Sequence, residues 1–247
     1  MAAVAVIGGT GMNEWPGLAI QRAQPVGTPY GDPSAPLIYG RIYGTDVIFL
    51  PRHGDGHKIP PHLINYRANL WALKDAGVRS VIAIAAVGGI GRKMKPAAVA
   101  VPDDLIDYTW GREHTYFDGV RAPLQHVDLS EPYAPALRGA LLAGARKAGV
   151  RLVNGGVMGI TQGPRLESPA EIARMKRDGC TMVGMTGMPE AALAKEAELD
   201  YAALAVSVNW AAGLGSGDIH GEIERSVAEG MKQVRAVLAK ALPALKA

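Results

Sequence analysis

The sequence predicts an α/β fold in which a central mixed, partly parallel and twisted sheet is flanked by helices. Short apolar runs alternate along the chain with stretches of helical spacing, as they do where helices connect the strands of a sheet. The run over residues 78–86 is apolar almost throughout, which is typical of a central strand covered on both faces. No repeat, low-complexity stretch or linker divides the chain, so we expect one domain over residues 1–247.

Strands are expected where apolar runs end in glycine, proline or polar residues. In chain order these runs are 2–7, 37–43, 46–50, 78–86, 99–101, 105–108, 157–160, 182–185 and 201–208. The second and third are joined around Gly44-Thr45 and predict a hairpin.

Helices are expected where apolar residues recur at helical spacing between start and stop signals. The expected helices cover residues 65–76, 134–148, 168–178, 188–196 and 221–242. Gly77 and Gly149 stop the first two. Ser168-Pro-Ala-Glu171 predicts a capping box with proline at the first helical position of the third.

The composition is that of an enzyme-like globular protein. The chain has 247 residues, 48% hydrophobic content and a net charge of +3, without a dense Lys/Arg stripe, so a nucleic-acid surface is not indicated. The single Cys180 excludes a disulfide framework and is typical of the reducing cytoplasm, where we expect the protein. Residues 1–7 are too short for a signal peptide, and no run has the length of a bilayer span.

Polar residues at two strand ends suggest a ligand site. The run 182–185 leads into Thr186-Gly187 and then a helix, so that Thr186 and free amides at a helix N-terminus can meet an anion. The run 201–208 delivers a single amide, Asn209. If the two strands are neighbours, an anion site and a polar group for a flat ligand lie side by side. Either residue alone is better explained as part of a loop or turn.

Four strand ends in all carry groups that suit an anion. They are Thr10 after Gly8-Gly9, Arg52 with His53, the turn from Ala85 and Ala86 to Gly89, and Thr186. Together they predict a phosphate site made of hydroxyls, backbone amides and one Arg. A Walker-type Gly-Lys-Ser/Thr is missing, so nucleotide hydrolysis is not favoured.

Two further features of the sequence bear on function, a group of histidines and a long irregular segment. His53, His57 and His62 make a zinc site conceivable, but the loop has neither helical His spacing nor cysteines, so we expect no metal. Residues 109–128 form a long irregular segment rich in His, Arg and aromatic residues, and segments of this length are often functional or interfacial.

Taken together, several motifs resemble those of the trimeric purine nucleoside phosphorylases. They are Gly8-Gly-Thr-Gly11, Arg52-His53-Gly54, Asn65-Tyr-Arg-Ala-Asn-Leu-Trp-Ala-Leu73, Gly163-Pro-Arg165 and Met185-Thr-Gly-Met-Pro-Glu190. The resemblance covers nearly the whole chain and is strongest to the methylthioadenosine phosphorylase branch. It implies attack of phosphate on C1′ of a purine nucleoside, with no metal or organic cofactor and with inorganic phosphate as co-substrate. It also implies a homotrimer, alone or as a dimer of trimers.

The resemblance implies roles for individual residues. Phosphate would be held by Thr10, Arg52, His53, Ala86 and Thr186. Met185 would pack under the ribose, and Asn209 would meet purine N7 and the 6-substituent. Arg52, His53 and Asn209 would thus be the catalytic residues.

The base site departs from that of the adenine-specific enzymes, which carry two Asp where this chain has Asn209 and Ala211. A single Asn can accept from N7–H and donate to O6, which suits a 6-oxopurine. Glu167 can accept from N1–H, which hypoxanthine has and adenine lacks. We therefore expect hypoxanthine or guanine as the base, although Glu167 alone is equally well explained as a solvated carboxylate at a helix start.

The 5′ end of the nucleoside leaves alternatives open. His126 resembles a position contributed by a neighbouring subunit, and His220 resembles a His that meets a 5′-hydroxyl. Similarity to the methylthio branch, with Leu214 and Ile223 nearby, favours S-methyl-5′-thioinosine as the substrate. Ala85 stands where relatives often have a polar residue. One contact to phosphate or sugar that the resemblance implies therefore has no matching side chain here.

Other functions remain as alternatives. The first is a general inosine/guanosine phosphorylase, and a methylthioadenosine phosphorylase is less favoured. A non-catalytic nucleoside-binding protein is disfavoured because Arg52, His53 and Thr186 are all present. A dehydrogenase of the dinucleotide-binding fold is disfavoured because Gly8 to Gly11 lacks a third glycine and a following helix.

Overall fold

The computed structural model describes residues 3–215 and 219–245, with side chains left out for residues 219–222. Its strands, in chain order, are β1 (Val4–Gly8), β2 (Ala19–Gln24), β3 (Leu37–Ile42), β4 (Thr45–Pro51), β5 (Ser80–Gly89), β6 (Val99–Val101), β7 (Asp104–Asp107), β8 (Val153–Asn154), β9 (Val157–Ile160), β10 (Cys180–Gly184) and β11 (Asp200–Trp210). Its α-helices are α1 (Tyr66–Asp75), α2 (Pro135–Ala148), α3 (Pro169–Arg177), α4 (Gly187–Glu196) and α5 (Ile219–Ala241). This confirms the predicted α/β class.

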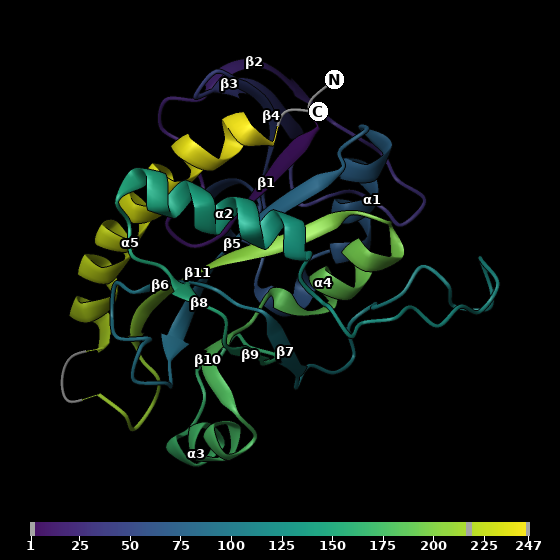
Figure 1. Cartoon of the computed structure of the whole chain (residues 1–247). Helices are drawn as coiled ribbons and strands as arrows, with labels where there is room; N and C mark the ends of the chain where they lie inside the picture. The colour runs from purple at the N-terminus through teal and green to yellow at the C-terminus, as the bar shows by residue number, and fades with distance from the viewer. Residues whose placement is uncertain (1–2, 216–218, 246–247) are drawn as a thin grey trace.

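Helices cover both faces of the central strands. Alternate residues of a strand point to opposite faces, and β1 follows this rule. Ala5 and Ile7 pack in the cluster that includes residues of α1 and α4, whereas Val4 and Val6 pack in the cluster that includes α2 and α5. Figure 1 shows α2 and α5 together on the near side of the sheet. The two clusters explain why the central strands are apolar along their whole length.

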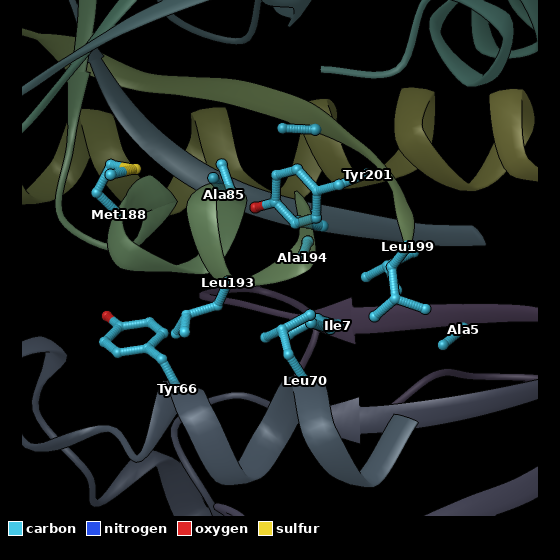
Figure 2. Close-up of a cluster of buried hydrophobic side chains, with 14 of the residues drawn as sticks. Ala5, Ile7, Tyr66, Leu70, Ala85, Met188, Leu193, Ala194, Leu199 and Tyr201 are labelled. Atoms are coloured by element: carbon cyan, nitrogen blue, oxygen red, sulfur yellow. The ribbon is translucent and has the colours of Figure 1, made fainter. Parts of the chain in front are cut away.

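The cluster between α1 and α4 lies next to the polar site described below. Figure 2 shows Tyr66 and Leu70 of α1 directed toward Leu193 of α4, with Tyr201 of β11 above them. Asn65 caps α1 by accepting from the backbone N–H of Ala68 at 3.1 Å. The tight packing of these two helices fixes the segments that precede both of them.

The sheet is mixed and divides at β5. Its main order is β2-β3-β4-β1-β5-β10-β9-β7, and β11 pairs with the other edge of β5 along its whole length. β1 runs parallel to β5 and ends its pairing at Ala83, whereas β10 runs antiparallel to β5 and pairs only with Gly88 and Gly89. Within the described residues, no strand therefore pairs with residues 84–87 on this edge. This unpaired stretch is called the β5 gap below.

The predicted hairpin, helix boundaries and capping box agree closely with the structure. β3 and β4 are antiparallel, and Ser168 and Glu171 form both hydrogen bonds of the capping box at the start of α3. α3 packs on β10 in a small separate cluster that includes Met175 and Cys180. None of the helices within the described residues has the length and apolar character that a bilayer span requires.

The structure differs from the sequence-based picture in one expected turn, in one strand adjacency stated as a condition, and in one strand that was not expected. Residues 85–89 are not a turn, because β5 continues to Gly89. The strands before Thr186 and around Asn209 are not adjacent, because the end of β5 lies between β10 and β11. β2 was not predicted, and all its side chains are exposed, so it has no apolar pattern that could mark it. It is held by its ladder to β3.

Candidate active site

A cavity of about 420 Å³ opens at the β5 gap. A volume of this size is ordinary for a small-molecule site. Its walls come from the ends of β1, β4, β5, β10 and β11 and from the loops after β4 and β9. Nine of the predicted site residues line it: Thr10, Arg52, His53, Ala86, Glu167, Met185, Thr186, Asn209 and Ala211.

Arg52 lines the cavity, and its charge is paired with the carboxylate of Glu190. Its Nε and Nη2 donate to the two carboxylate oxygens of Glu190 at 2.7 and 2.8 Å, and both side chains are almost fully buried, at 1% and 0% exposed. The hydroxyl of Tyr201 donates to the same carboxylate at 2.7 Å. Burial alone lowers the pKa of Arg52, but the charge and hydrogen bonds of Glu190 raise it above its usual value. The arginine is therefore a fixed, permanently protonated donor and not an unpaired cation.

The β5 gap holds the guanidinium in the plane of the sheet. Arg52 Nη1 donates to the carbonyl of Ile84 at 2.8 Å, where a neighbouring strand would otherwise bind. A Cβ at Gly9 would lie 2.5 Å from that carbonyl and 2.9 Å from Nη1, so only glycine lets the chain pass here. Because alternate residues of a strand direct their backbone groups to the same edge, the N–H of Ala86 faces the gap as well.

His53 lines the cavity as a neutral ring. Its Nδ1 lies 2.8 Å from the carbonyl of Ile59, which can only accept, so Nδ1 carries the proton. Burial, together with the charge of Arg52, lowers the pKa of His53 to about 4. At neutral pH the remaining nitrogen, Nε2, is therefore an acceptor. A ring in this state suits an oxyanion that still carries a proton, such as hydrogen phosphate.

Thr186 supplies a hydroxyl and opens a helix. It precedes α4, yet its side chain makes no capping hydrogen bond. Met188 has non-helical angles of φ −123° and ψ 141°, so the helix is kinked within its first residues. The first amides of a helix have no partner inside the helix, and they suit an anion. Thr10, in the turn after β1, lines the same cavity.

Asn209 lies on a β-bulge in β11 and keeps one acceptor and one donor for a ligand. The register with β5 shifts between Ser207 and Asn209. Its Nδ2 donates to the carbonyl of Trp210 at 2.7 Å, which fixes the orientation of the amide. Among the described residues this amide has no other hydrogen-bond partner, so Oδ1 and the second hydrogen on Nδ2 can meet a ligand, which is the pair of groups that a 6-oxopurine requires.

Glu167 faces the cavity from the loop after β9. Its Oε1 accepts from the hydroxyl of Thr161 at 2.6 Å, which leaves Oε2 as an acceptor. Met185 packs on Gly163, where an added Cβ would lie 2.6 Å from the Met185 sulfur. Ala211 completes this wall and is held by a backbone hydrogen bond to Gly89.

Two predicted residues are not placed in this cavity. His126 is exposed in the long connection between β7 and α2 and does not line the cavity of its own chain. Figure 1 shows this connection extending away from the body of the molecule. The side chain of His220 lies outside the described residues. The roles of both therefore stay proposals.

Several residues around the cavity were not predicted from the sequence to line it. Residues 57–61 form a wall that includes Lys58 and two prolines, and His57 stacks on His53 with ring centroids 4.1 Å apart. Glu190 was read only as part of a motif. A carboxylate inside an otherwise apolar helix could have indicated a buried partner for a cation.

No group of three or more His, Cys, Asp or Glu side chains that could hold a metal ion occurs among the described residues. His53 and His57 are close, but their Nδ1 atoms are taken by Ile59 and by Asn13.

Comparison with known proteins agrees with this geometry. The family model described as the phosphorylase superfamily matches residues 3–243. A relative from Pseudomonas syringae pv. tomato, named probable S-methyl-5′-thioinosine phosphorylase, is 50% identical over 99% of this chain and 100% of its own length. The 6-oxopurine nucleoside phosphorylase of Pyrococcus furiosus is 39% identical over 98% of this chain and 93% of its own.

Among solved structures, methylthioadenosine phosphorylase from Schistosoma mansoni in complex with adenine is similar, with a TM-score of 0.92. It is 30% identical to this chain, and the match covers 99% of this chain and 92% of the other. The likeness extends over the fold as a whole and includes the elements that build the cavity.

Proposed function

The chain belongs to the phosphorylase superfamily, and we propose that it is a pentosyltransferase that cleaves 6-oxopurine nucleosides with inorganic phosphate. The proposed substrate is S-methyl-5′-thioinosine, which yields hypoxanthine and 5-methylthioribose 1-phosphate. The observation that carries the proposal is that groups for an anion and two groups for a 6-oxopurine, Asn209 and Glu167, line one cavity. The names of relatives with 50% and 39% identity support the reaction and the base.

Phosphate is proposed to lie between Thr10, Arg52, His53 and Thr186, with the amide of Ala86 at the β5 gap. One phosphate oxygen attacks C1′ while the C1′–N9 bond breaks and its electron pair passes to the purine. The sugar gains positive charge in the transition state, and the phosphate anion offsets it. The preset donors around the cavity hold the anion in line for this attack.

The leaving purine is proposed to be stabilised by Asn209. Its Oδ1 accepts from the proton that N7 gains, and its free N–H donates to O6. Glu167 accepts from N1–H through Oε2. An adenine base would present its amino group to the Asn209 N–H and would leave Glu167 without a proton to accept, and such unpaired polar groups discriminate strongly.

The choice between a 5′-methylthio group and a 5′-hydroxyl is supported by the apolar lining of one part of the cavity. Val208, Ala212 and Ile223 give part of the cavity an apolar lining, which supports the methylthio group. A general 6-oxopurine nucleoside phosphorylase is the second candidate, supported by the name of the Pyrococcus furiosus relative.

The remaining proposals follow from the sequence and from the resemblance. The uninterrupted sequence and the single Cys180 support one phosphorylase domain over residues 1–247 in the cytoplasm. The resemblance supports a homotrimer, alone or as a dimer of trimers, with His126 reaching the cavity of a neighbour. Inorganic phosphate would be the co-substrate, without a further cofactor or metal.

Purine release would be measured in parallel from S-methyl-5′-thioinosine, inosine and methylthioadenosine, with and without phosphate. Faster release from the thioinosine is expected, and it should depend on phosphate. Preference for inosine would favour the second candidate, and preference for methylthioadenosine would refute the roles of Asn209 and Glu167. Release that is independent of phosphate would refute phosphorolysis.

A further inference from the structure

Arg112 is a buried arginine whose side chain joins two walls of the cavity without lining it. It belongs to the long connection between β7 and α2 and is 8% exposed. One wall is the turn formed by residues 185–188, which carries Thr186. The other is the segment formed by residues 161–167, which carries Glu167. Neither wall is near Arg112 in the sequence.

The guanidinium donates to both walls at once. Nη1 donates to the carbonyls of Met185, at 2.9 Å, and Met188. Nη2 donates to the carbonyls of Thr161, at 3.2 Å, and Gln162, at 2.8 Å. Nε donates to the Gln162 side chain at 3.1 Å. Each wall is therefore held by one edge of the same planar group.

A third contact ties this group to α1 and to the loop after β4. Nη1 also donates to the hydroxyl of Tyr66 at 3.2 Å, and that hydroxyl donates to the carbonyl of Pro61 at 2.9 Å. Pro61 lines the cavity. All the hydrogen-bond partners of Arg112 within the described residues are neutral oxygens. Asp107 acts on it through its charge, but neither it nor another described carboxylate accepts a hydrogen bond from it. Burial lowers the pKa of this guanidinium.

A structural ion pair does not explain such an arrangement. Burying a cation without a hydrogen-bonded anion is costly, and it is tolerated where every donor finds an acceptor. The five N–H groups of an arginine, held in a rigid fork, can donate to the four backbone carbonyls and the side-chain acceptors around Arg112. The three N–H groups of a lysine cannot. The 161–167 segment also contacts the strand that precedes the turn, since the N–H of Thr161 donates to the carbonyl of Gly184. That contact does not reach beyond Gly184 into the turn.

We propose that Arg112 is a positioning residue that sets the 185–188 turn and the 161–167 segment relative to each other, so that phosphate binding and base selection both depend on this one side chain. The inference rests on the proposed function. On the first side, Arg112 fixes the carbonyl of the peptide whose N–H belongs to Thr186. On the second, it fixes Thr161, whose hydroxyl holds Glu167 at 2.6 Å.

The test compares Arg112→Lys with Arg67→Lys. Arg67 is a matched control because it is also 8% exposed and is paired with Glu113, next to Arg112 in the same connection, yet contacts neither wall. Two quantities are measured: KM for phosphate, and the ratio of kcat/KM for 6-oxopurine over 6-aminopurine nucleosides.

Arg112→Lys is expected to raise KM for phosphate and to lower the selectivity ratio, each about ten-fold or more, since several charge-assisted hydrogen bonds are lost. Arg67→Lys is expected to change both by less than about three-fold, as for a substitution outside the site. The proposal is overturned if Arg112→Lys leaves either quantity unchanged, or if Arg67→Lys changes both equally.

Two additions keep the test decisive. If Arg112→Lys does not fold, Tyr66→Phe removes one acceptor from the guanidinium, and smaller changes in the same direction are expected; unchanged values would overturn the proposal.

If the wild type releases no purine, the proposed function fails separately. Arg112 is then tested by the rise in melting temperature with inorganic phosphate, which should be smaller in Arg112→Lys than in Arg67→Lys, and an equal rise would overturn the proposal.

Discussion

Replacing Glu190 by Gln tests the charge balance beneath the cavity. The substitution keeps the shape of the side chain but removes the charge that faces Arg52 at 2.7 and 2.8 Å. Because Arg52 and Tyr201 both donate to this carboxylate, the new amide must also place its NH₂ group against a donor. Removing one partner of a buried ion pair costs about 3–5 kcal/mol. For a chain of this size the melting temperature should then fall by about 6–20 °C.

Phosphate should distinguish this variant from one that is merely less stable. With Glu190 neutral, Arg52 becomes an unbalanced cation, and a bound dianion would offset its charge. Inorganic phosphate should therefore raise the melting temperature of Glu190→Gln by more than it raises that of the wild type. Thermal unfolding across a phosphate titration measures both quantities.

Two controls separate charge from packing. Tyr201→Phe removes one hydrogen bond from the same carboxylate but no charge, so it should cost only about 1–3 kcal/mol and leave the effect of phosphate unchanged. The double replacement Arg52→Met with Glu190→Leu removes both charges and should recover most of the lost stability, since apolar pairs often replace buried ion pairs without loss. A Glu190→Gln protein with wild-type stability and a wild-type response to phosphate would refute the reasoning.

Three further predictions concern the cavity itself. Asn209→Asp should shift kcat/KM toward 6-aminopurine nucleosides by about ten-fold or more, because a carboxylate accepts from the amino group and cannot donate to O6; an unchanged ratio contradicts the assigned role. Gly9→Ala should raise KM for phosphate, because its Cβ would lie 2.9 Å from Arg52 Nη1, whereas Gly27→Ala, where a Cβ meets no atom within 4 Å, should leave it unchanged. The pKa of His53 is lowered to about 4 by burial and by Arg52, so the unfolded chain takes up a proton first as the pH falls. Stability should therefore decline from about pH 6.5 toward pH 4, and urea unfolding of His53→Gln should show a weaker decline.

The elements with strong local signals could be predicted from the sequence. The apolar run at 78–86 gave the central strand, and Ser168 with Glu171 gave the capping box, because each depends on neighbouring residues alone. The anion-binding groups at four strand ends could be identified from the sequence, but their convergence could not be proved from it. The rule that parallel strand ends share one edge of a sheet covers Thr10 and Arg52, whereas Thr186 follows β10, which runs antiparallel to β5. The cavity does bring Thr10, Arg52 and Thr186 together.

Long-range pairing could not be predicted in the same way. Arg52 and Glu190 are far apart in the sequence, and nothing local to either indicates that one neutralises the other. Arg112 carries no local signal either, since its acceptors are carbonyl groups that every residue possesses. The exposed strand β2 has no apolar alternation, so the sequence pattern does not predict it or its pairing with β3.

The β5 gap also bears on how this protein prevents a foreign strand from pairing with the sheet at its ligand site. A strand with a free edge is a template on which other chains can add, and proteins normally shorten, bend or cover such edges. Here the free edge covers only residues 84–87 and is closed at one end by β1 and at the other by β10. A foreign strand has no room to enter, and Arg52 already occupies one carbonyl. The protein can thus offer sheet backbone to a small ligand without offering it to the growth of an aggregate.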